Sequence, residues 1–158
     1  GYNYGARLYS RVKEVFWKTA KLATGVTTLC FLISVLIPNL ATGIFTHDEE
    51  LLGIASKGLT MLNVAFPIVG FQMVATNFFQ SLGMVRKSVL LSLSRQILFL
   101  LPLLYSLPLM MGAKGIWLSF PVSDVMAFVL TAILLRSLFK KFSRLKDGED
   151  PSILGSNL

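Results

Sequence analysis

The sequence contains few of the residues that build disulfide scaffolds and metal centres. Its 158 residues include one cysteine, Cys30, and one histidine, His47. A single cysteine cannot form an intrachain disulfide, and a histidine without other histidine or cysteine nearby lacks the usual partners of a metal site. We therefore expect no metal and no cofactor that needs such ligands. The redox compartment stays open.

Charged residues are also scarce, at 15% of the chain, whereas 54% of the residues are hydrophobic. The mean hydropathy is +0.67. An ordinary soluble domain contains roughly a quarter charged residues. The deficit falls in long blocks, and the charges crowd between them. Three blocks carry no charge and the fourth carries only Asp124; they are residues 22–46, 58–85, 96–113 and 115–135. This pattern predicts an integral membrane protein.

Each block is long enough to cross a hydrocarbon core, which takes roughly 20 apolar helical residues. Because backbone groups in lipid must be hydrogen-bonded, we expect α-helices, and the alternation of barrel strands is absent. The predicted fold is an all-α membrane protein with four transmembrane helices. We expect an arm at 1–18, a membrane region at 19–146 and a polar cytoplasmic tail at 147–158. The predicted spans are about 19–45, 59–83, 88–111 and 115–138.

Prolines occur in every block, and membrane helices tolerate them as kinks or breaks. They are Pro38, Pro67, Pro102, Pro108 and Pro121. The sequence alone does not separate simple bends from the broken helices that transporters use.

Basic residues indicate the orientation. Thirteen of the fifteen fall on one side of the four-span topology, and only Lys57 and Lys114 fall on the other. The positive-inside rule then places both ends of the chain in the cytoplasm. This placement explains the net charge of +7 without nucleic acid, because the basic residues lie at helix ends, where they attract anionic lipid headgroups. We expect the lipid bilayer as a partner and no nucleic acid.

Asp124 is the charged residue most difficult to place in lipid. It lies about halfway along the fourth block, and a carboxylate there costs a few kcal/mol or more unless it faces protein or water. One interpretation is a binding site for a coupling proton or cation. The other is an interhelical hydrogen bond, such as one to backbone released by Pro121. Arg95 is expected to snorkel to the cytoplasmic surface, and an ion pair between Arg95 and Asp124 is not expected.

The second block carries a polar stripe. Gln72, Thr76 and Gln80 recur at four-residue spacing and share one helix face, with Asn77 beside them. Such a stripe faces either a partner helix or a cavity. The four residues are therefore candidates for lining a substrate chamber, and helix–helix contact is the alternative. No nucleophile–base pair is evident, so we expect no enzyme and no catalytic residue.

Several segments, in order, resemble the MATE family of multidrug and toxic compound exporters, and most closely its MepA-like bacterial branch. The resemblance runs from residue 1 to about 146. Its segments are GYNYGAR at 1–7, FPIVGFQ at 66–72, FQSLG at 79–83, LSLSRQ at 91–96, GIW at 115–117 and FPVSD at 120–124.

The resemblance implies a fold of twelve helices in two six-helix lobes, with this chain supplying helices nine to twelve. We accordingly expect a C-terminal fragment, opening with Gly1 inside a motif, whose missing N-terminal helices belong to the same polypeptide. The implied function is secondary active efflux of lipophilic cationic drugs against Na⁺ or H⁺ in the bacterial inner membrane. NorM-like members have an acid on the tenth helix, whereas the matching segment here has Gln72, Asn77 and Gln80. The coupling ion stays open, and its main ligand need not lie in this chain.

Three alternatives remain. A lipid-linked saccharide flippase of the same superfamily would be expected to carry a basic residue in the middle of a span, and none is predicted. A non-transporting membrane subunit is compatible with the polar stripe and Asp124. A small four-helix pump usually has a glutamate in its first span, which residues 22–46 lack.

Overall fold

The computed structural model describes residues 1–37, 42–44 and 48–150. In order, the helices with defined bounds are α1 (Tyr2–Gly5), α2 (Tyr9–Leu36), α4 (Glu49–Asn63), α5 (Phe66–Ser81), α6 (Val85–Leu93), the π-helix η1 (Ser94–Leu100), α7 (Leu101–Met111) and α8 (Ala113–Phe142). Throughout the described ranges the regular structure is helical, which confirms the predicted all-α fold. Pro38, His47 and the end of the predicted tail, 151–158, lie outside the described residues.

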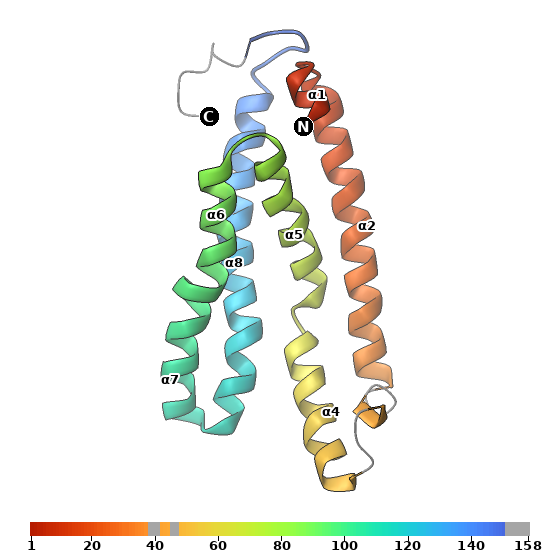
Figure 1. The fold of residues 1–158 in the computed structure, drawn as a ribbon, viewed down its shortest axis with the longest axis vertical. Helices are drawn as coiled ribbons and strands as arrows, with labels where there is room; N and C mark the ends of the chain where they lie inside the picture. The colour runs from red at the N-terminus through yellow and green to blue at the C-terminus, as the bar shows by residue number, and fades with distance from the viewer. Residues whose placement is uncertain (38–41, 45–47, 151–158) are drawn as a thin grey trace.

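The helices make four long passes that run side by side, with both ends of the described chain at one end of the bundle (Figure 1). Three passes are long and apolar enough to cross a membrane without a break: Tyr9–Leu36, Val85–Met111 and Ala113–Phe142. The remaining pass consists of α4 and α5, which are bent by 48°. Residues 9–18, assigned to the arm from the sequence, form the first turns of α2.

The bend between α4 and α5 has a local cause. Pro67 is near the first position of α5, and it has no N–H to donate to the carbonyl of Asn63, where α4 ends. At its other end α4 is capped by Asp48, whose side chain accepts hydrogen bonds from the backbone of Glu50 and Leu51. The second pass is therefore two well-defined helices joined at a proline break.

The third pass changes midway from an α-helix to a π-helix and back. α6 gives way to the π-helix η1, and α7 follows with Pro102 near its start. Pro102 cannot donate a hydrogen bond to Leu98, four residues earlier, which lies inside the wider π-helix. The proline predicted to bend this span thus lies directly after an altered helical segment.

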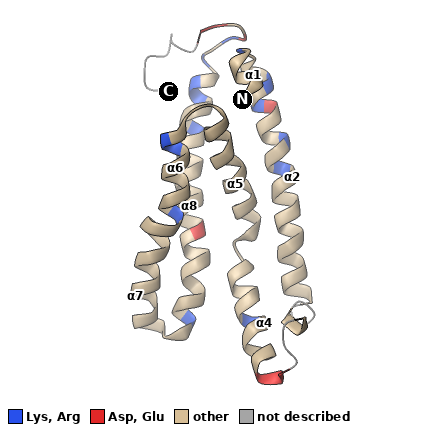
Figure 2. Ribbon diagram, in the orientation of Figure 1, with Lys and Arg blue, Asp and Glu red and all other residues tan. Residues whose placement is uncertain are grey.

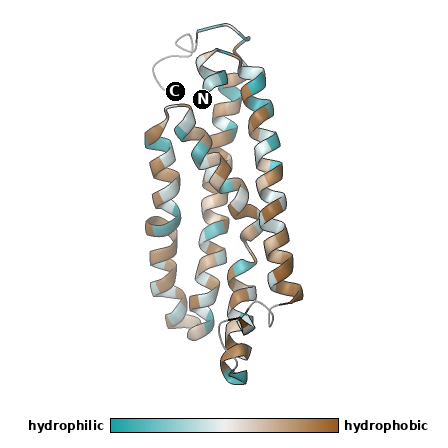
Figure 3. Cartoon of the chain, turned by 45° about the vertical axis from the view of Figure 1, so that its right-hand side comes forward, coloured by the Kyte–Doolittle hydropathy of each residue, from teal (hydrophilic) through white to brown (hydrophobic). Residues whose placement is uncertain are grey.

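Hydrophobic residues make up much of every long helix (Figure 3), and many of their side chains are exposed. Leu29, Leu98 and Leu109 are 59%, 58% and 75% exposed, as expected for helices in contact with lipid or with further helices. Lys and Arg instead concentrate toward the end that carries both termini (Figure 2). The tightest core lies at this same end, where Tyr9, Phe16, Phe79 and Phe142 are buried together.

The first residues of the predicted tail contact the arm. Ser10 donates its backbone N–H to Asp147 Oδ1 at 2.9 Å, and Arg7 Nη2 lies 2.7 Å from Asp150 Oδ2. Gly148 donates its backbone N–H to the Arg7 carbonyl at 2.9 Å. This arm–tail contact, formed by Arg7 and Ser10 with 147–150, joins the start of α2 to the end of α8.

Candidate functional site

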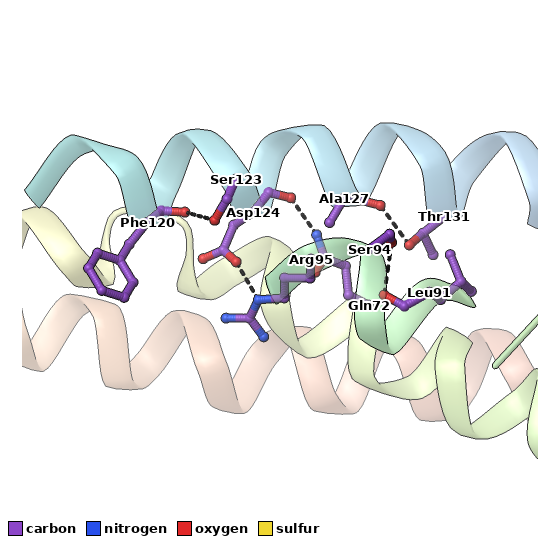
Figure 4. Close-up of polar contacts among 9 residues, drawn as sticks. All are labelled: Gln72, Leu91, Ser94, Arg95, Phe120, Ser123, Asp124, Ala127 and Thr131. Carbon is purple, nitrogen blue, oxygen red and sulfur yellow. Dashed lines mark hydrogen bonds and ion pairs between the residues drawn. The ribbon is translucent and has the colours of Figure 1, made fainter. Parts of the chain in front are cut away.

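Two opposite charges meet inside the bundle. Asp124 lies on α8 with 4% of its surface exposed, and Arg95 lies on η1. Arg95 Nε is 2.6 Å from Asp124 Oδ1. Figure 4 shows the guanidinium and the carboxylate facing each other from neighbouring helices. The third and fourth passes are therefore joined by an ion pair.

This ion pair overturns the prediction that Arg95 snorkels to the surface and does not reach Asp124. The third pass begins at Val85 rather than near residue 88, which places Arg95 about 15 Å along the pass at 1.5 Å per residue. Asp124 lies about 16 Å from the start of α8 at Ala113, which comes from the opposite side. In a core about 30 Å thick, both residues are near the middle.

The carboxylate is held mainly by charge. Its Oδ1 atom is buried, and the Arg95 guanidinium, with Nε 2.6 Å away, is its partner. Most buried polar atoms in proteins have such a partner. Arg95 sits on the π-helix, a kind of helical irregularity that often occurs at functional sites. The pair thus combines an altered helix with a buried carboxylate whose partner is a cation.

Gln72 connects the second pass to the same point. Its side chain is 5% exposed, and Nε2 donates a hydrogen bond to the backbone carbonyl of Asp124 at 2.5 Å (Figure 4). An interhelical hydrogen bond does form at Asp124, but it uses the backbone of Asp124 itself. Gln72 and Arg95 therefore hold one residue of α8 from two other passes.

A pocket of about 230 Å³ lies beside this junction. Gln72, Thr76 and Asn77 from the predicted polar stripe line it. The other lining residues are Met73, Leu91, Ser92, Arg95, Gln96 and Thr131. Gln80, one turn further along α5, is exposed and lies outside this pocket. The structure thus brings three of the four chamber candidates together with Arg95, next to Asp124.

Hydroxyl groups near the junction bind their own helices. Ser119 donates to the Gly115 carbonyl at 2.7 Å, and Thr131 donates to the Ala127 carbonyl at 2.8 Å. Ser123 and Ser94 bond to carbonyls three residues earlier in the same way (Figure 4). Such back-bonding satisfies a hydroxyl inside an apolar helix. These serines and the threonine support the helices locally.

The sequence did not indicate that Arg95, Gln96 and Thr131 belong to the site. The one available signal for Arg95 was its place in a largely apolar stretch, because an arginine there can pair with an acid in the next stretch, here Asp124. No group of three His, Cys, Asp or Glu residues that could hold a metal ion occurs within 1–37, 42–44 and 48–150.

Comparisons with known proteins agree on one family. The MatE family model matches residues 1–106. A solved structure of the MATE multidrug transporter DinF-BH, in complex with a ligand, is similar at 38% identity and a TM-score of 0.83, over 92% of this chain and 32% of that chain. A second solved chain, named only protein A, gives 38% identity and a TM-score of 0.82, again over 92% and 32%. No curated protein matches.

The present chain therefore spans about a third of the length of the solved structures that it resembles. The MepA-like branch stays a prediction. The match of the family model to residues 1–106 and the two structural similarities establish the assignment: the chain belongs to the MATE family of transporters.

Proposed function

We propose that this chain is the C-terminal part of a secondary active exporter, which moves drugs out of the cell in exchange for Na⁺ or H⁺. The observation that carries the proposal is the 38% identity and the TM-score of 0.83 with a MATE multidrug transporter. Lipophilic cations are the proposed substrates. The remaining helices of the same polypeptide would complete the transporter.

In this proposal the Arg95–Asp124 pair is a two-state element. A proton or cation that binds the Asp124 carboxylate competes with the guanidinium of Arg95, 2.6 Å away. Binding of the coupling ion would therefore favour a conformation in which the pair is separated. An ion shifts a conformational equilibrium only through such a difference in affinity between two states. Asp124 is thus the candidate coupling residue within this chain, with Arg95 as its competitor.

The pocket lined by Gln72, Thr76 and Asn77 is the proposed part of the substrate chamber. Amide and hydroxyl groups there can orient a ligand without adding charge. Gln80 remains a candidate only if the chamber extends along α5 beyond this pocket. Arg95 lines this pocket, so its separation from Asp124 would change the charge that a bound ligand meets. Binding of the coupling ion would in this way affect binding of the ligand.

We place the protein in the bacterial inner membrane with both ends of this chain in the cytoplasm. The concentration of basic residues at the end of the bundle that carries both termini supports this orientation. A reporter enzyme fused after the last residue should be active in the cytoplasm. Activity of that fusion only outside the cytoplasm would reverse the topology.

The flippase alternative was expected to require a basic residue in the middle of a span, and none was predicted from the sequence. The third pass does carry a basic residue near mid-membrane, Arg95. Its charge is compensated by Asp124, however, and is not available alone for a pyrophosphate. Export of cationic drugs therefore remains the better-supported function, and lipid-linked saccharide transport becomes an outcome of the test.

The test uses cells that express the complete protein, with efflux of a fluorescent cationic rhodamine dye as the measurement. We expect faster efflux than in cells without the protein, and a changed pH dependence in the Asp124→Asn variant. Full efflux by Asp124→Asn at all pH values would remove Asp124 as a coupling residue. Absence of efflux for a panel of lipophilic cations, together with translocation of a lipid-linked saccharide, would support the flippase instead. If neither substrate moves, the chain is part of a non-transporting membrane subunit.

A further inference from the structure

Two apolar grooves lie on the surface formed by α2, α5 and α8, away from the polar pocket. One has a volume of about 580 Å³ and follows α2 from Trp17 to Leu32. The other has a volume of about 590 Å³ and follows α8 from Ala132 to Ser143. Trp17 and Phe71 line both grooves. The grooves therefore adjoin at these two rings, and we call them together the α2–α8 cleft.

The rim of the cleft is basic. Lys21 lines the α2 groove, and Arg136 and Lys140 line the α8 groove. All three side chains are exposed, and no acidic residue among those described lines either groove. A lipophilic cation would be repelled here, whereas an anionic amphiphile would be attracted. The α2–α8 cleft thus favours anionic ligands, whereas the pocket lined by Gln72, Thr76 and Asn77 is proposed for cationic drugs.

Two of these basic residues lie one helical turn from a pair of rings that pack against each other. The rings of Trp17 and Phe139 lie 6.0 Å apart across the cleft. Lys21 follows Trp17 by four residues, and Arg136 precedes Phe139 by three, so each lies on the same helix face one turn deeper in the bundle. Both charges therefore lie about one turn deeper than the two rings, and an anion bound there can balance them.

The polarity of the cleft changes with depth. The α8 groove, with Arg136, Lys140 and the Ser143 hydroxyl, lies toward the end of the bundle that carries both termini. The α2 groove continues toward the middle of the membrane past Gly25 and Leu29. A phospholipid has the same order, with a charged headgroup at the surface and acyl chains below it. Basic pockets between helices near a membrane surface are known to bind anionic headgroups.

We propose that the α2–α8 cleft binds an anionic phospholipid from the leaflet on the side of the chain termini. Its phosphate lies between Lys21 and Arg136, with Lys140 beside it, and one acyl chain follows the α2 groove against Trp17 and Phe71. The site requires the membrane location of the chain but does not depend on drug export. Its failure would therefore leave the proposed function intact, and the reverse also holds.

Lipid retention by the complete protein tests the charged part of this site. The purified protein is exposed to phosphatidylglycerol or phosphatidylcholine with identical acyl chains, and bound lipid is measured by native mass spectrometry. We expect retention of phosphatidylglycerol, and about 30-fold weaker binding in Lys21→Gln/Arg136→Gln, since each basic residue near anionic lipid contributes about fivefold. The control Lys57→Gln/Lys114→Gln removes two charges at the other end and should bind as the wild type does.

The apolar part is tested without changing charge. Gly25 lines the α2 groove, and a Cβ atom added there meets nothing within 4 Å. Gly25→Leu should therefore fold normally but fill the groove and reduce lipid retention. Gly53 on α4 is equally open, and Gly53→Leu is the matched control. The inference is wrong if the wild type retains both lipids equally or neither, as when other helices of the protein fill the cleft. Unchanged retention in the charge variant or in Gly25→Leu would also overturn it.

Discussion

Arg95 and Asp124 form an ion pair in which the two partners are unequally buried. The Asp124 side chain is 5% exposed, whereas the Arg95 side chain is 39% exposed. Loss of Arg95 would leave a buried carboxylate without a counter-charge. Loss of Asp124 would leave a partly exposed guanidinium that can turn toward the polar side chains of the neighbouring pocket, such as Gln96. The two single substitutions should therefore have different effects on stability.

We expect Arg95→Gln to lower the free energy of unfolding by about 2 kcal/mol, less than the 3–5 kcal/mol of a fully buried pair because Arg95 is partly exposed. Asp124→Asn should cost less than about 1 kcal/mol, since the freed guanidinium can find other partners. Thermal unfolding of the complete protein in detergent measures both. The double variant should recover part of the loss seen in Arg95→Gln. Equal effects of the two single variants, adding without coupling in the double variant, would contradict a direct pair.

Gln72→Leu removes the hydrogen bond between α5 and the Asp124 carbonyl without changing charge. Interhelical hydrogen bonds in membranes contribute about 0.6–2 kcal/mol, so we expect a loss of roughly 1 kcal/mol in unfolding free energy. Gln80→Leu is the matched control on the same helix, because Gln80 is exposed. A loss as large in Gln80→Leu as in Gln72→Leu would show that burial against α8 is not what matters.

The membrane character of the chain could be predicted from the sequence because it depends on long local runs without charge. The polar stripe was also local, since it required only four-residue spacing. The sequence could not predict that Gln72 is buried and Gln80 is exposed, because this depends on where α8 packs against α5. Local pattern thus defined the helices, and packing decided which of their polar residues meet.

The depth of Arg95 was missed for a related reason. Arg86 and Lys87 suggested that the span begins after them, near residue 88, whereas the helix begins at Val85. The π-helix that carries Arg95 has no simple sequence signal apart from the nearby Pro102. Its ion pair with Asp124 spans two passes, and a pairing of this kind requires the three-dimensional packing of helices.

The close approach of α7 and α8 depends on a glycine in the first turn of α8. A Cβ atom on Gly115 would overlap the backbone carbonyl of Leu107 and approach the Pro108 nitrogen. Gly115→Ala must therefore push α7 and α8 apart, and overpacking of this kind costs about 1–3 kcal/mol. Gly53→Ala, where a Cβ meets no neighbour, should leave the melting temperature nearly unchanged. Equal melting temperatures for both variants would mean that the hairpin is looser than the structure indicates.

The arm–tail contact should be sensitive to acid. The backbone N–H of Ser10, which donates to the Asp147 carboxylate, holds the pKa of that group below its ordinary value of 3.8. A depressed pKa means that the contact is stabilised at pH above the ordinary value and weakens as the pH falls through the lower, folded value. Hydrogen exchange of the Ser10 amide measures this directly. We expect its protection to fall in acid.

The control for this prediction is Asp147→Asn, in which the titrating group is gone. Its Ser10 amide should be less protected than in the wild type near neutral pH, should approach the wild type in acid, and should show no additional step beyond the intrinsic change in exchange rate. The same dependence on pH in the wild type and in Asp147→Asn would show that Asp147 does not control the arm–tail contact.

Proteoliposomes that contain the complete protein show whether this chain belongs to an ion-driven drug exporter. An imposed H⁺ or Na⁺ gradient is applied, and accumulation of the cationic rhodamine dye against its own gradient is followed by fluorescence. We expect accumulation that depends on one of the two gradients and is lost when that gradient is dissipated. Movement of the dye that is absent, or that proceeds equally with and without either gradient, would contradict it.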